Sequence, residues 1–133
     1  MKNTQKKRKC KFFIATGNAR EEIKILDQII NSDLKEFCVP LNNLNISEII
    51  PIIKNCNVAI CNDSSFSHLS AALNIPTIVL MTDTPLVYGS YSSQMHPILP
   101  EGTNTVSHDT LGKDKINPSE IQKKLDEILL RVS

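Results

Sequence analysis

The chain has 133 residues, of which 41% are hydrophobic and 22% charged, and its formal net charge is +1. This length and composition are typical of one globular domain that can bury a core without disulfides or metals. The near-neutral charge argues against a nucleic-acid partner, because it implies no broad basic surface. No apolar run approaches the roughly 18 residues that a membrane-spanning helix needs.

The chain begins with a basic run, Lys6-Lys7-Arg8-Lys9, which holds most of the local positive excess. We expect residues 1–10 to form a flexible, solvated tail that makes at most a peripheral membrane contact. No long apolar core or small-residue cleavage site follows, so the segment is a poor signal peptide. The four cysteines show no CxxC spacing and favour reduced, buried thiols. We therefore expect a cytoplasmic protein, either free or at the inner face of the membrane.

The first half of the chain alternates short apolar runs with amphipathic helices. The first strand stops at Gly17, and the second helix is capped by Asn45 with Glu48 three residues on. The expected elements are a strand over 11–16, a helix over 19–31, a strand over 36–40 and a helix over 45–55.

The second half continues this alternation. Its two strongest strands are almost wholly apolar, as expected for parallel strands covered on both faces. On the helix between them, we expect Phe66, Leu69, Ala72 and Leu73 to point inward and His68 to lie on the outer side. The expected elements are strands over 57–61 and 76–81 around a helix over 65–74, a loop to Gly89, weak strands at 97–99 and 103–106, and a last helix from Pro118.

This alternation predicts an α/β fold, a three-layer doubly wound parallel sheet of about five strands in a single Rossmann-like domain over residues 11–133. Right-handed crossovers suggest the flavodoxin-like strand order 2-1-3-4-5. The switch point then lies between strands one and three, whose carboxyl ends carry GNAREE and NDSSFSH. Ligands of such sheets bind at that point.

NDSSFSH joins the end of a buried strand to the start of a helix, where about four backbone N–H groups lack partners. The hydroxyls of Ser64 and Ser65 add further donors, so this turn can hold a phosphate or pyrophosphate. His68, one turn into the helix, could reach the bound anion. The plainer interpretation is that Asp63 or Ser64 only caps the helix and that His68 is merely exposed.

The segment ISEIIPIIKNCNVAICNDSSFSHLSAALNIPTIVLM resembles the core of glycosyltransferase family 9, the ADP-heptose:lipopolysaccharide heptosyltransferases. FFIATGNAREEIKIL is similar to the family's strand–glycine–glutamate helix, and NPSEIQKKLDEILL to its closing helix. The sequence departs from the family at Ser65, where the motif has glycine, and at Met81-Thr82, where it has phenylalanine and glycine. The matching motif positions are Asn62, Asp63, Ser64, His68, Leu69, Ala71, Ala72, Leu73 and Pro76.

The resemblance implies the C-terminal, donor-binding half of a GT-B glycosyltransferase that binds a nucleotide-diphosphate sugar of the ADP-heptose type. It places Asp63, Ser64, Ser65 and His68 around the diphosphate and the sugar. It also places three residues near the nucleoside: Gly17, Glu21 and Leu44. The alternative is that Glu21 is only a first-turn helix charge and Leu44 only a hydrophobic staple beside the helix cap.

The family's acceptor-binding half and its catalytic base have no counterpart in these residues. We therefore expect a separate acceptor-binding domain or self-association to complete transfer to a lipopolysaccharide-type acceptor. No metal or cofactor is expected, because His68, His96 and His108 lack metal-ligand spacing.

Two other interpretations stay open. The chain could be a non-catalytic α/β module that binds a phosphate-bearing ligand or a protein partner. It could also be a receiver-like domain, but that fold needs an acidic cluster after the first strand, where this chain has TGNA. Fold analogy alone assigns no activity.

Overall fold

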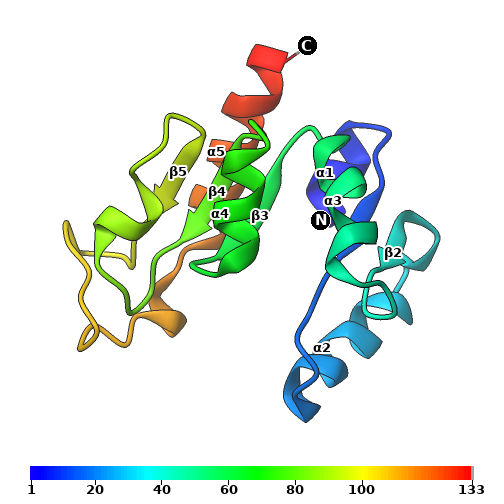
Figure 1. The fold of residues 1–133 in the computed structure, drawn as a ribbon, viewed down its shortest axis with the longest axis horizontal. Coiled ribbons are helices and arrows are strands. Elements are labelled where there is room, and N and C mark those ends of the chain that lie inside the picture. The colour runs from blue at the N-terminus through cyan, green and yellow to red at the C-terminus, as the bar shows by residue number, and fades with distance from the viewer. Residues whose placement is uncertain (133) are drawn as a thin grey trace. The chain divides into compact units, whose positions relative to one another are not determined.

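A computed structural model describes residues 1–132 of the chain. The chain divides into two compact units, Met1–Ile49 and Ile50–Ser133, each with its own sheet (Figure 1). All recorded strand pairs are parallel, and helices alternate with the strands along the chain. This arrangement confirms the predicted α/β class.

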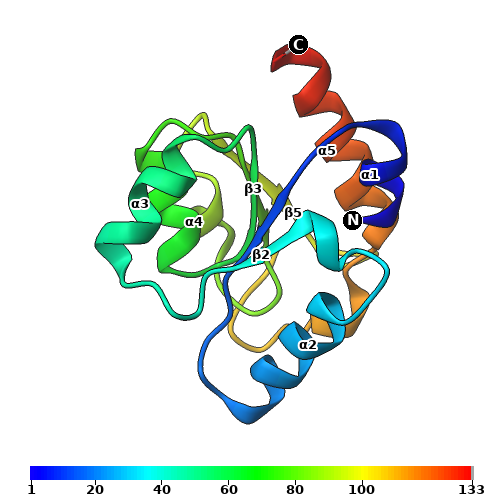
Figure 2. The ribbon, with the colours of Figure 1, turned by 90° about the vertical axis from the view of Figure 1, so that its right-hand side faces the viewer.

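The first unit is built on a sheet of two short parallel strands (Figure 2). Phe12 pairs with Cys38 and Ile14 with Pro40. Helix α2 contacts β2 and buries Leu26. The elements are α1 (Lys2–Lys7), β1 (Phe12–Ile14), α2 (Arg20–Ile30), a 3-10 turn (Lys35–Phe37) and β2 (Cys38–Pro40).

Residues 1–10, expected to be a flexible tail, contain helix α1. Thr4 is buried, and the Lys2 ammonium lies 3.4 Å from the Asp33 carboxylate. Lysine and glutamine are good helix formers, so this segment needs only a small packed face to become ordered. The charge pattern alone gave no sign of that face.

Helix α3 (Ile46–Lys54) follows β2 and begins in the predicted capping box. The Asn45 side chain accepts a hydrogen bond from the Glu48 N–H at 3.2 Å. The Glu48 carboxylate in turn accepts one from the Asn45 N–H at 2.9 Å. Ile49 and Ile53 form the buried part of its apolar stripe.

The second unit has three layers. The sheet has the order β3-β4-β5, with α4 against β3 and β4 and α5 against β4 and β5 (Figure 1). On one face Val79 packs with Ala71 of α4, and on the other Ile78 packs with Leu125 of α5. The elements are β3 (Ala59–Asn62), α4 (Ser65–Ala72), β4 (Thr77–Leu80), a 3-10 turn (Leu86–Gly89), β5 (Met95–Ile98), a second 3-10 turn (Lys113–Lys115) and α5 (Pro118–Val132).

Two details differ from the sequence-based prediction. The expected single sheet of order 2-1-3-4-5 is instead two sheets, β1-β2 and β3-β4-β5. Hydrophobic periodicity identifies the strands but does not fix their lateral order. The weak strand predicted at residues 103–106 does not form. Val106 is buried in the core, so its apolar character reflects packing without a strand partner.

Candidate functional site

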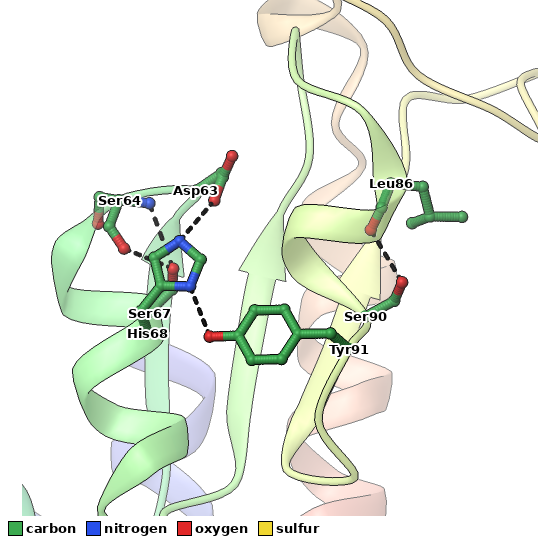
Figure 3. Close-up of polar contacts among 7 residues, drawn as sticks. All are labelled: Asp63, Ser64, Ser67, His68, Leu86, Ser90 and Tyr91. Atoms are coloured by element: carbon green, nitrogen blue, oxygen red, sulfur yellow. Dashed lines mark hydrogen bonds and ion pairs between the residues drawn. The ribbon is translucent and has the colours of Figure 1, made fainter.

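The candidate site lies where β3 passes into α4. Asp63 and Ser64 form the connection, and Ser64, with an extended backbone, is the N-cap of α4. The Ser67 hydroxyl accepts a hydrogen bond from the Ser64 N–H at 3.2 Å and donates one to the Ser64 carbonyl at 2.7 Å (Figure 3). Ser64, one of the two predicted caps, therefore takes that place, and Asp63 is left for another contact.

Helix α4 packs on the sheet through small side chains. Ser67, Ser70 and Ala71 are buried. The predicted inward face was wrong, because Ala72 is exposed and the large side chains Phe66, Leu69 and Leu73 are only half-buried. Small residues let the helix approach the sheet closely. The residues buried against the sheet are therefore the small ones and not the most hydrophobic ones. His68 lies outside this stripe, as predicted, with 40% of its side chain exposed.

Asp63 and Tyr91 lie on either side of the His68 ring (Figure 3). Nε2 of His68 is 3.4 Å from Oδ1 of Asp63, whose side chain is only 13% exposed. Nδ1 of His68 is 2.7 Å from the Tyr91 hydroxyl. The two rings are nearly parallel, at 11°, with centroids 5.6 Å apart. Each ring nitrogen of His68 thus has one polar neighbour.

Sequence reasoning missed Tyr91. It lies 23 residues after His68, between the loop predicted to end at Gly89 and the weak strand predicted at 97–99, where the sequence predicts no element. The available signal was its position, because the segment follows β4 and so leaves the sheet at the edge where ligands of α/β folds bind. An aromatic hydroxyl in such a segment was a candidate for the site.

The arrangement suits an anion. Ser65 and Phe66 open α4, and their N–H groups precede the first hydrogen bonds of the helix, whereas the Ser67 N–H already donates to the Ser64 carbonyl at 3.0 Å. The hydroxyls of Ser64 and Ser65 stand beside them, and the helix dipole adds positive character. At 3.4 Å the contact between His68 and Asp63 is longer than a normal hydrogen bond, so a ring N–H can also serve a ligand.

The three residues expected near a nucleoside belong to the first unit. Gly17 and Glu21 are exposed, and Leu44 is half-buried just before the cap of α3. Glu22, not Glu21, accepts a hydrogen bond from the Ala19 N–H at 3.2 Å and lies against Gly17. Glu21 therefore has no share in that contact at the start of α2. The structure groups the four second-unit residues at one helix start and leaves these three in the other unit.

Over residues 1–132, no helix is both long and apolar enough to cross a bilayer. In the same part of the chain, no cluster of three or more His, Cys, Asp and Glu side chains could hold a metal ion. All four cysteines are free.

Comparison with known proteins identifies the relatives of this chain. The model of glycosyltransferase family 9 (heptosyltransferase) matches residues 2–115. A lipooligosaccharide heptosyltransferase 2 of Haemophilus influenzae is 38% identical over 86 residues. That match takes in 62% of this chain and 23% of the relative, so it spans less than a quarter of that protein. No solved structure shows significant similarity.

Proposed function

Because the chain belongs to glycosyltransferase family 9, we propose that it binds the nucleotide-diphosphate sugar from which a glycosyl group is transferred. The observation that supports this most directly is the start of α4, where His68 and Asp63 stand beside the first-turn N–H groups. A diphosphate needs several donors at one place, and this turn offers backbone, hydroxyl and imidazole donors together.

Each side chain has a distinct part in this proposal. The hydroxyls of Ser64 and Ser65 and the first-turn amides donate to the diphosphate, and His68 donates a ring N–H. Asp63 can only accept hydrogen bonds when it is ionised. It orients His68 and accepts a hydrogen bond from a hydroxyl of the sugar. Negative charge grows on the diphosphate as the glycosidic bond breaks, so donors already in place lower the barrier to transfer.

Gly17, Glu21 and Leu44 complete the proposal on the nucleoside side. Glu21 would accept from the ribose hydroxyls, and Leu44 offers an apolar surface for the base. These three assignments rest on the family resemblance rather than on a contact with the residues of α4.

The acceptor and the catalytic base are proposed to come from another polypeptide domain or a second copy of the chain, because the matched region is a minor part of the relative. The relative is named a lipooligosaccharide heptosyltransferase, and we propose a heptose donor of the ADP type and a lipopolysaccharide-type acceptor by that likeness. We place this reaction in the cytoplasm, with the basic residues before β1 available for a peripheral contact with the inner face of the membrane.

Calorimetric titration with ADP, UDP, GDP and ADP-heptose tests the proposal. We expect ADP-heptose to bind most tightly and ADP next, because the sugar adds contacts to Asp63. H68A should weaken ADP binding by about tenfold, the loss expected for one hydrogen bond to a charged group. H108A is the matched control, since His108 is an exposed histidine outside α4 and outside the proposed site. Absence of binding by all four ligands would overturn the proposal.

A further inference from the structure

The segment between β4 and β5 brings Tyr91 to His68 and is itself well anchored. Gly89 is buried so closely against Met81 that an added Cβ would lie 2.3 Å from the methionine sulfur. The next residue, Ser90, donates its hydroxyl to the Leu86 carbonyl at 2.9 Å (Figure 3). Tyr91 is 60% exposed, so its own burial does not hold it. Its backbone is instead fixed by the two residues before it.

The contacts of His68 favour one position for its proton. A neutral imidazole has one N–H donor and one acceptor nitrogen. An ionised Asp63 can only accept, so its position favours a hydrogen on the nitrogen that faces it, Nε2. Nδ1 is then the acceptor, and the Tyr91 hydroxyl at 2.7 Å donates to it.

We propose that Tyr91 is a positioning residue, which keeps the proton of His68 on Nε2 and holds the plane of the ring. This inference rests on the proposed function, because Nε2 is the nitrogen that would donate to the diphosphate. The Tyr91 hydroxyl disfavours the other tautomer of His68, because a proton on Nδ1 would leave that nitrogen unable to accept the hydrogen bond from Tyr91. It also restrains rotation of a side chain that is 40% exposed.

The first experiment uses the free protein and needs no ligand. Nitrogen-15 NMR of the imidazole at neutral pH reports which ring nitrogen is protonated and whether the other accepts a hydrogen bond. We expect wild-type His68 to carry its proton on Nε2, and Y91F to shift the Nδ1 resonance toward that of an unbonded acceptor. Y88F is the matched control, because Tyr88 lies in the same segment and is 50% exposed. It should leave both resonances in place.

Two results would overturn the assignment. One is a wild-type proton on Nδ1, which would make Tyr91 the acceptor. The other is an Nδ1 resonance that is the same in Y91F and wild type, which would mean that the hydroxyl does not reach His68 in solution. Thermal unfolding of Y91F checks that the variant is folded, and we expect little change because the ring is exposed.

The second experiment measures the consequence for binding. Y91F should weaken ADP binding about fivefold, as expected for the loss of one neutral hydrogen bond that orders a binding group. Equal ADP affinity of Y91F and wild type would refute the role in binding. If wild type binds no ADP, the proposed function fails, whereas the NMR result still decides whether Tyr91 sets the tautomer of His68.

Discussion

The Ser67 hydroxyl makes two hydrogen bonds to the backbone of Ser64, the N-cap of α4. Replacing Ser67 therefore tests whether these bonds stabilise the turn that carries the site. S67A removes the hydrogen bond from the Ser64 N–H at 3.2 Å and the one to the Ser64 carbonyl at 2.7 Å. Ser67 is fully buried. The Ser64 N–H therefore loses an acceptor that is shielded from water, whereas the Ser64 carbonyl keeps its hydrogen bond from the Ser67 N–H at 3.0 Å.

The expected cost follows from these contacts. One intramolecular hydrogen bond contributes about 0.5 to 1.5 kcal/mol net, and loss of a helix cap costs about 0.5 to 2 kcal/mol. The two descriptions cover the same atoms and are not summed, so we expect S67A to lower the free energy of unfolding by about 1 to 2 kcal/mol. With a urea dependence of about 2 kcal/mol per molar, the midpoint should fall by about 0.5 to 1 M.

Urea unfolding followed by circular dichroism measures this change. S65A is the matched control, because Ser65 is exposed in the same turn and should change stability by less than about 0.5 kcal/mol. If S67A unfolds at the same urea concentration as S65A and wild type, the turn does not depend on the Ser67 hydroxyl.

Three further predictions concern the rest of the second unit. G89A should destabilise the fold by about 1 to 3 kcal/mol, because the new methyl group would press on the buried Met81 side chain; an unchanged melting temperature would contradict this packing. Burial raises the pKa of the Cys61 thiol to about 11. Iodoacetamide at pH 8 should therefore label it far more slowly in the folded than in the urea-unfolded protein, and equal rates by peptide mass spectrometry would refute this. Burial, aided by Lys124 and Arg131 and opposed by Glu127, lowers the pKa of His96 below its ordinary 6.5. The unfolded chain then binds the proton more readily, so stability should fall as the pH drops below 6.5, and H96Q should lose less stability over that range than wild type.

The helices and strands were largely predictable because each carries local signals. The Asn45–Glu48 capping box formed as expected, and β4 was recognised from a run that is buried on both faces of its sheet. Strand β5 was only a weak prediction, since Pro97 interrupts its pattern. The segment 103–106 shows the opposite case, in which an apolar residue is buried without a strand.

The candidate site was predictable only in part. Asp63, Ser64, Ser65 and His68 are consecutive or one helical turn apart, so their proximity follows from local structure. The contact between His68 and Tyr91 joins residues that are 23 positions apart. Its geometry depends on the close packing of Gly89 against Met81, which fixes the segment just before Tyr91. No periodic pattern encodes such a contact. The buried face of α4 was mispredicted for a similar reason, because close approach to the sheet favours serine over leucine there.

The face of α4 that packs on the sheet carries two buried serines, Ser67 and Ser70. The distance between this helix and the sheet therefore depends on the size of the side chains at these two positions. A bulkier residue at Ser70, which is buried one turn beyond Ser67, would lift the helix and carry its first turn away from Tyr91. Ligand preference could thus drift through changes that touch no ligand. Selection for ligand affinity would then change a buried residue that makes no contact with the ligand.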